Sequence, residues 1–295
     1  MKIDQLLNRM PLTFGILLLV DSLHFVFARA LKPYLPGGTG AFFVLGVATI
    51  EMTLFLGVRR SIKLTVFRQH APFFLTIGFM VAAATALNYT AVSFVDAGTA
   101  AMLAQTSTLF ALILGVVWLR DTLNIRQIMG AALTILGVFI IYFQPGDFLR
   151  LGSLLVLASA FMYALHAAVV KRYGESLDFA NFFLFRVAST TFFLFCYVLL
   201  QQQLVLPTAN IAWLYLLAAG TIDVVISRVL YYLVLRRMTV SIHALLLTLS
   251  PVITIGWSLV LFAEWPTWMA LGGGLSVVAG VLLVTIRPQR KRGTS

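Results

Sequence analysis

The sequence predicts an all-α membrane protein of ten transmembrane helices, built as two inverted five-helix repeats with both termini in the cytoplasm. Three observations support this fold class. The chain is 61% hydrophobic and only 11% charged over 295 residues, which is far more apolar than a soluble domain. Its apolar residues fall in ten long windows, and two stretches of sequence 143 residues apart repeat each other. Its Lys and Arg residues gather on one side of this arrangement.

Ten mostly apolar windows of roughly 18 to 25 residues are long enough to cross a hydrocarbon core of ~30 Å. They lie at residues 10–31, 39–57, 71–92, 98–119, 126–143, 151–170, 179–200, 211–235, 239–262 and 267–286. The links are short, so almost the whole chain forms one membrane domain with no room for a soluble catalytic domain. The first window carries Asp21 and His24 and lacks the cleavage pattern of a signal peptide, so we expect it to remain as a span.

A single ungapped offset aligns about fifty residues of the first half with the second. Matched positions are Tyr89 with Tyr232, Ala101 with Ala244, Ser107 with Ser250, Asp121 with Glu264, Gly130 with Gly273, and Gly137 with Gly280. Each half has five windows, and two consecutive halves with an odd number of spans must enter the membrane from opposite sides. The repeat is therefore inverted, with predicted units at 1–147 and 148–288 and a basic cytoplasmic tail at 289–295.

The net charge is +11, and the Lys and Arg residues are distributed as the positive-inside rule predicts. With the N-terminus inside, the predicted cytoplasmic segments hold 16 of the 21 Lys and Arg residues, and the outer loops with their flanks hold three. We expect the basic tail to meet anionic lipid headgroups rather than nucleic acid, and the chain to lie in the inner membrane of a bacterium.

Glycines seven residues apart lie two helical turns apart on one face of the fifth and tenth windows. They are Gly130 and Gly137 in the first half, and Gly273 and Gly280 in the second. Small residues at this spacing let helices approach closely in lipid. We interpret these faces as helix packing within a scaffold or at a dimer surface, which leaves monomer and homodimer both open.

Polar side chains gather at the middle of the fourth and ninth windows. Gln105 and Thr108 lie at the centre of the fourth, and Ser250 precedes a helix-bending proline in the ninth. These groups either line a cavity at the centre of the repeat or form hydrogen bonds between helices. Four tyrosines are further candidates for a pocket wall because each offers a ring face and a hydroxyl: Tyr89, Tyr163, Tyr231 and Tyr232.

Five charged residues lie within predicted spans: Asp21, Glu51, Arg186, Asp223 and Arg228. A charge at the bilayer centre costs at least ~2.5–3.5 kcal/mol, so such residues usually face a bundle interior and mark a pathway. Asp21 and Asp223 lie deepest and are predicted to bind substrate or a proton, or to form structural ion pairs with Arg186 or Arg228. His24 lies one turn after Asp21 and is either a proton relay or substrate contact, or a hydrogen-bonded interior histidine.

Motifs for other chemistry are missing from the sequence. It contains neither a phosphate-binding Gly-x-x-x-x-Gly-Lys loop nor a zinc-binding His-Glu-x-x-His run. Cys196 is the only cysteine, so no intrachain disulfide forms. We therefore expect no cofactor and no metal, and only Asp21 with His24 is a weak candidate pair for a membrane-embedded hydrolase.

These features resemble the drug/metabolite transporter superfamily, and specifically its EamA-type ten-helix exporters. The resemblance rests on an acidic residue that closes the fourth span of each half, Asp121 and Glu264, followed by the glycine-patterned fifth span. The Leu-Asn-Tyr-Thr-Ala run at 87–91 and the Ser250-Pro251 pair also resemble family patterns. The resemblance covers about residues 10–286. It implies a cavity formed by spans 1, 3, 4, 6, 8 and 9 and export of amino acids, aromatic metabolites or drugs.

Two departures from the family pattern indicate that the halves have diverged. Arg186 fits an arginine common early in the second span, but Gly46 stands at the matching place in the first half. Thr108 stands where a proline is usual. Asp21, Glu51 and Asp223 have no acidic counterparts in the other half, and the resemblance assigns them no substrate.

The leading prediction is a secondary active transporter that exports a small metabolite, such as an amino acid or related amphiphile, by alternating access with proton antiport as its coupling. Its partners are then the small-molecule substrate, membrane lipid and protons, with no nucleic acid. The alternatives are an uncoupled facilitator or an exporter of drugs and cationic compounds. A membrane-embedded enzyme that acts on lipids is the remote alternative.

Overall fold

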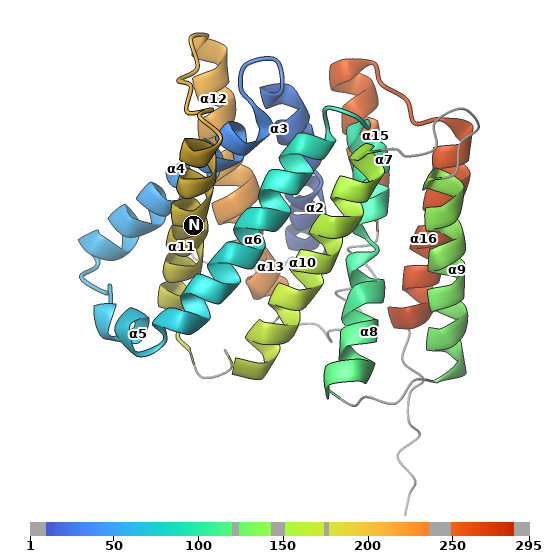
Figure 1. Cartoon of the computed structure of the whole chain (residues 1–295), viewed down its shortest axis with the longest axis horizontal. Helices are drawn as coiled ribbons and strands as arrows, with labels where there is room; N and C mark the ends of the chain where they lie inside the picture. The colour runs from blue at the N-terminus through green and yellow to red at the C-terminus, as the bar shows by residue number, and fades with distance from the viewer. Residues whose placement is uncertain (1–9, 120–123, 143–150, 174–176, 236–248, 286–295) are drawn as a thin grey trace, which may run out of the picture.

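The computed structural model describes residues 10–119, 124–142, 151–173, 177–235 and 249–285, and every regular element in these ranges is a helix. Figure 1 shows the long helices side by side in one bundle. The elements are α2 (Met10–Asp21), α3 (His24–Leu31), α4 (Gly37–Val58), α5 (Leu64–Gln69), α6 (Ala71–Ala91), α7 (Ala97–Ala104), α8 (Ser107–Leu119), α9 (Ile125–Tyr142), α10 (Leu151–Tyr173), α11 (Phe179–Leu200), α12 (Asn210–Ala218), the π-helix η1 (Ala219–Ile226), α13 (Ser227–Leu235), α15 (Ser250–Phe262) and α16 (Trp268–Thr285). The all-α fold class is confirmed for the described residues.

Seven helical segments within the described residues are long and apolar enough to cross a membrane. They are Thr13–Leu31, Gly37–Val58, Ala71–Ala91, Ala97–Trp118, Leu151–Tyr173, Phe179–Leu200 and Asn210–Tyr231. Three shorter apolar helices cover Ile125–Ile140, Ser250–Phe262 and Trp268–Leu283, where spans five, nine and ten are predicted. The total of ten spans, the sidedness of the termini and the two unit boundaries stay predictions, and the basic tail at 289–295 lies outside the described residues.

Close contacts at glycines hold the long helices together. α6 packs against both α10 and α11. A Cβ atom on Gly78 of α6 would lie 2.5 Å from the Cβ of Ser189 on α11, so only glycine allows the two helices to approach this closely. A Cβ on Gly220 in η1 would likewise lie 2.6 Å from a methyl carbon of Val47 on α4. These contacts fix η1 against α4, and η1 carries one of the intramembrane carboxylates.

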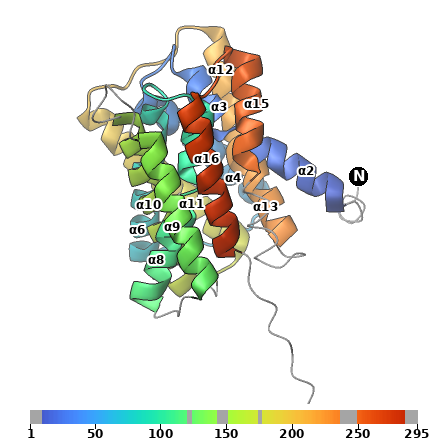
Figure 2. The same ribbon diagram turned by 90° about the vertical axis from the view of Figure 1, so that its right-hand side faces the viewer.

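α9 and α16 lie side by side at one edge of the bundle, as Figures 1 and 2 both show. A Cβ on Gly137 would lie 2.5 Å from the carbonyl oxygen of Gly273, and a Cβ on Gly280 would lie 2.5 Å from that of Gly130. The four repeated glycines therefore face each other across this contact. The packing interpretation of these residues is confirmed.

The start of α11 is tied to the loop that follows α4. Asp178 is the N-cap, and its Oδ2 accepts hydrogen bonds from the backbone N–H of Asn181 at 3.3 Å and from its Nδ2 at 2.9 Å. Asn181 also donates from Nδ2 to the Ser61 carbonyl, and its Oδ1 accepts from the backbone N–H of Lys63. These hydrogen bonds hold the carboxylate form, so the pKa of Asp178 lies below its usual value of 3.8.

Candidate functional site

The first predicted span is broken at its middle, between α2 and α3. The Leu23 N–H bonds to the Val20 carbonyl three residues back, and the helix starts again at His24. Thr254 of α15 donates from its hydroxyl to the Ser22 carbonyl at 2.9 Å, and the Trp257 indole N–H donates to the Ser22 hydroxyl at 3.1 Å. Side chains of α15 therefore satisfy polar groups at the break, which an irregular backbone inside a membrane requires.

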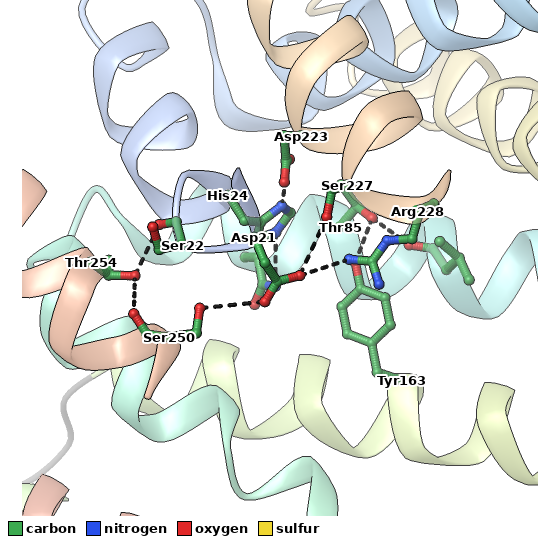
Figure 3. A network of polar contacts seen from close by, with 12 residues as sticks. Asp21, Ser22, His24, Thr85, Tyr163, Asp223, Ser227, Arg228, Ser250 and Thr254 are labelled. Carbon is green, nitrogen blue, oxygen red and sulfur yellow. Dashed lines mark hydrogen bonds and ion pairs between the residues drawn. The ribbon is translucent and has the colours of Figure 1, made fainter. Parts of the chain in front are cut away.

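The eighth predicted span contains the π-helix η1 between α12 and α13. Asp223 lies within it and is only 3% exposed. The Thr221 hydroxyl, also in η1, donates to Glu51 Oε1 on α4 at 2.5 Å. The wider turn of a π-helix shifts the direction of its side chains and often marks a functional site. Here it directs Asp223 towards the break in the first span (Figure 3).

The fourth predicted span is also interrupted, between α7 and α8. Gln105 and Thr106 separate the two helices, and the Thr106 hydroxyl donates to the Leu103 carbonyl at 2.7 Å. Spans one, four and eight thus all depart from regular α-helix near mid-length. Discontinuous helices of this kind place backbone and side-chain groups around a central site in many transporters.

Asp223 and His24 form the buried half of a polar cluster. His24 Nδ1 lies 2.9 Å from Asp223 Oδ2, and because an ionised carboxylate can only accept, Nδ1 carries the hydrogen. His24 Nε2 then accepts from the side-chain amide of Asn88 at 3.4 Å. The histidine is held from both sides, and its ring packs edge-on against Tyr89 with the centroids 5.9 Å apart.

Asp21 and Arg228 form the more accessible half. Arg228 Nη2 lies 3.7 Å from Asp21 Oδ1, which is too far for a hydrogen bond, and the two side chains are 36% and 21% exposed. The hydroxyls of Ser227 and Ser250 donate to the two oxygens of Asp21 at 3.4 and 3.3 Å. The Arg228 guanidinium also lies 5.8 Å from the centre of the Tyr231 ring. This ion pair is looser than a hydrogen-bonded one.

Two buried polar atoms beside this cluster have no hydrogen-bond partner. They are Asn88 Oδ1 and the Tyr89 hydroxyl. Buried polar atoms without a partner are uncommon in proteins, and each is a place where a bound molecule can donate or accept. Nearby, the Tyr163 hydroxyl lies 3.1 Å from that of Thr85, and Figure 3 shows both next to Arg228.

The cluster carries one net negative charge while His24 is neutral, since it holds two carboxylates and one guanidinium. One proton or one cationic group therefore neutralises it. Within the described ranges, no three His, Cys, Asp or Glu side chains gather so as to hold a metal ion.

Most of the residues predicted from the sequence meet in this cluster. Spans one, three, six, eight and nine contribute Asp21, His24, Tyr89, Tyr163, Asp223, Arg228, Tyr231 and Ser250. Glu51 instead bonds to Thr221, Arg186 interacts electrostatically with Tyr163, and Gln105 and Thr108 flank the break in span four. The predicted substrate-binding roles stay predictions, and so do the coupling or ion-pair roles predicted for Glu51, Arg186 and Arg228.

Sequence reasoning missed several members of the network. Asn88, Ser227 and Thr254 were not selected, although Asn88 lies beside Tyr89 and Ser227 beside Arg228. The sequence signal that could have identified them is that each lies within one helical turn of a residue already predicted for the site. Asp121, the repeat counterpart of Glu264, lies outside the described residues.

Both halves of the chain match the same known protein family. The EamA-like transporter family matches residues 12–143 and again residues 150–286. A relative described as the uncharacterized transporter YdfC of Bacillus subtilis (strain 168) is 26% identical over 199 residues. That similarity covers 65% of this chain and 64% of the relative, so the chain matches less than two thirds of the relative's length.

A solved crystal structure has the same fold. It superposes on 94% of this chain and 97% of its own with a TM-score of 0.66, at 17% sequence identity. An identity this low supports the architecture alone. The paired family match, in contrast, assigns each half of the chain to the same kind of repeat.

Proposed function

This chain belongs to the EamA-like transporter family, and we propose that it is a secondary active transporter that exports a small metabolite, an amino acid or related amphiphile, across a bacterial inner membrane. The observation that supports this proposal most is the net negative cluster where spans one, three, eight and nine meet. Each of these spans is broken or joined to another by side-chain hydrogen bonds at this depth.

An amino acid complements the cluster at both of its charged ends. Its ammonium group matches Asp21, and its carboxylate matches Arg228, the nearest cation to Asp21 among the described residues. Because Asp21 and Arg228 lie 3.7 Å apart without a hydrogen bond, a zwitterion can replace their mutual contact with two charge-assisted hydrogen bonds. Tyr231 offers a ring face for an apolar side chain.

Proton coupling in this proposal uses His24 and Asp223. A second proton on His24, at Nε2, makes the cluster neutral and removes its attraction for the ammonium group. The Asn88 amide faces Nε2 and can turn its unpaired Oδ1 towards it, so both protonation states of His24 find a partner. Proton binding and substrate binding then compete, which is the requirement for antiport.

The test is flux in proteoliposomes with a panel of amino acids, cationic drugs and nucleosides. We expect Asp223→Asn to abolish flux driven by a pH gradient while exchange at equal pH stays partly intact. Asp21→Asn should remove substrate binding at every pH. Glu51→Gln is the matched control, because Glu51 is an intramembrane carboxylate outside the cluster and glutamine still accepts from Thr221. The absence of saturable flux for the whole panel, or wild-type flux in both aspartate variants, would contradict the proposal.

A purely structural ion pair predicts another result. Removal of Asp21 would then leave Arg228 without its counter-ion, and the yield of folded protein would fall. The double variant Asp21→Asn/Arg228→Gln removes both charges. Recovery of folding without recovery of binding separates a structural role of the pair from its role in binding.

Export of cationic compounds is the second candidate, since a net negative cluster also attracts a simple cation. Arg228 repels such a substrate but binds the carboxylate of an amino acid. Arg228→Gln should therefore strengthen binding of a cationic drug and abolish binding of an amino acid. Saturable flux that ignores a pH gradient in the wild-type protein would instead identify a facilitator.

A further inference from the structure

A second charged cluster lies at the end of the bundle where α3, α6 and α15 finish. Arg29 near the end of α3 donates from Nη2 to Glu264 Oε1, and from Nη1 to the Val92 carbonyl at 2.6 Å. Lys32 donates to the Ser93 carbonyl at 3.3 Å. Spans one, three and nine, which all contribute to the central cluster, are thus tied together at one end.

The tied end is the outer one under the predicted sidedness. It also contains a cavity of about 570 Å³, a volume typical of small-molecule sites. We call it the vestibule, and its lining includes Arg29, Lys32, Tyr34, Tyr215, Phe262 and Glu264. The rings of Tyr34 and Tyr215 lie 6.3 Å apart, so charged groups and aromatic faces border the same space.

Glu264 is held by only one of its carboxylate oxygens. Oε1 accepts from Arg29, while Oε2 is buried and has no hydrogen-bond partner. A bidentate pair would use both oxygens, so this contact is weaker than the best that arginine and glutamate can form. The residue before it, Ala263, adopts a left-handed conformation with φ of 53°, which is energetically unfavourable for residues other than glycine. The closed arrangement is therefore one that a competing ligand can displace.

The vestibule has the opposite charge balance to the central cluster. Arg29 and Lys32 supply two positive charges and Glu264 supplies one negative charge, which leaves one net positive charge. Within the described residues, Lys32 forms no ion pair. A ligand carboxylate placed between Arg29 and Lys32 would balance this charge, and an apolar body would rest on the two tyrosines.

We propose that the vestibule is a second binding site, specific for a small carboxylate with an aromatic or apolar body, and that its carboxylate replaces Glu264 on Arg29. Release of Glu264 unties span nine from spans one and three and opens the outer end. The site rests on the proposed function, because the carboxylate in question is that of the exported solute on its way out.

The first experiment measures binding in the vestibule without transport. Ala30 also borders the cavity, so the protein Cys196→Ala/Ala30→Cys is reacted from outside with a membrane-impermeant thiol reagent. The probe is 3-phenylpropionate, and phenethylamine is its control with the same ring and no carboxylate. At ten times its Kd the probe should slow the reaction about tenfold, and phenethylamine should not. Lys32→Gln should abolish the protection, whereas Lys63→Gln at the opposite end of the bundle should not.

The second experiment measures opening. In Cys196→Ala/Ser250→Cys, the reagent added outside should reach the central cysteine slowly. Reaction should become about tenfold faster with 3-phenylpropionate, or with Glu264→Gln in the absence of any probe. Absent protection at Ala30→Cys, or equal protection by phenethylamine, overturns the site. An unchanged rate at Ser250→Cys under both conditions overturns its role in opening.

The labelling experiments distinguish failure of the vestibule site from failure of the proposed function. Labelling requires no flux, so a chain that transports none of the tested metabolites still reports on the vestibule. Flux with a normal dependence on Asp21 and Asp223 but without carboxylate protection would overturn the second site alone. The experiments with 3-phenylpropionate leave Glu264 unchanged, so their results remain valid even if Glu264→Gln fails to fold.

Discussion

Replacement of Gly280 by alanine tests whether the contact between α9 and α16 supports the bundle. The new Cβ would lie 2.5 Å from the carbonyl oxygen of Gly130, whereas ordinary contact begins at 3.4 Å, so the helices must separate by about 0.9 Å. The nearest atom, Thr134 Oγ1, can rotate away, but the Gly130 carbonyl oxygen and the Thr134 backbone nitrogen at 2.6 Å cannot. Overpacking of this kind costs about 1–3 kcal/mol, and the higher helix propensity of alanine returns about 0.5–1 kcal/mol. We expect a net loss of up to about 2.5 kcal/mol.

The assay is thermal unfolding of purified protein in detergent, followed by intrinsic tryptophan fluorescence. Gly272→Ala is the matched control, since it lies in the same helix and its Cβ would have nothing within 4 Å. It should leave the unfolding temperature unchanged or raise it, while Gly280→Ala lowers it by a few degrees. Equal unfolding temperatures for the two variants would show that close approach of α9 and α16 does not stabilise the protein, and would refute the reasoning.

Two further substitutions test the break in span one and the cap of α11. Thr254→Val removes the donor to the Ser22 carbonyl and should cost about 1 kcal/mol. Thr53→Val is the control, because the exposed Thr53 hydroxyl bonds only within its own helix, and it should be neutral in the same assay. Equal effects of the two substitutions would contradict the idea that Thr254 stabilises the break. Asp178→Ala removes the N-cap and should cost about 1 kcal/mol near pH 7, and Asp178→Asn should cost less because asparagine also caps. The folded pKa of Asp178 is lowered, so its stabilisation is present above 3.8 and is lost as the pH falls through the folded value. A gap between wild type and Asp178→Ala that does not shrink at all as the pH is lowered below 3.8 would contradict this assignment.

The fold class follows from the sequence because composition and period are local properties. Apolar windows, the 143-residue repeat and the paired glycines all predict helices that pack within a membrane, and the structure agrees for the described residues. The break at Ser22 was not predicted. Its stability depends on Thr254 and Trp257, which lie more than 230 residues away, and hydropathy contains no information on such partners.

The candidate site was partly predictable for a related reason. A charge deep in an apolar window is costly wherever it lies, so Asp21, Asp223 and Arg228 could be selected without a structure. The choice of partners depends on helix rotation, and the π-helix turns Asp223 towards His24 rather than towards an arginine. The contact between Arg29 and Glu264 was not predicted either, because the two residues end different spans.

Under the two proposals, the central cluster and the vestibule set an order of events for export. In this scheme the solute first leaves Asp21, which lies at the break in the first span, and its carboxylate then binds Arg29 near the end of α3. Departure is easiest when a proton from the outer side has neutralised the central cluster at His24. Proton entry and solute release then use the same outer end, and in this scheme the solute carboxylate frees Glu264 from Arg29 as it leaves.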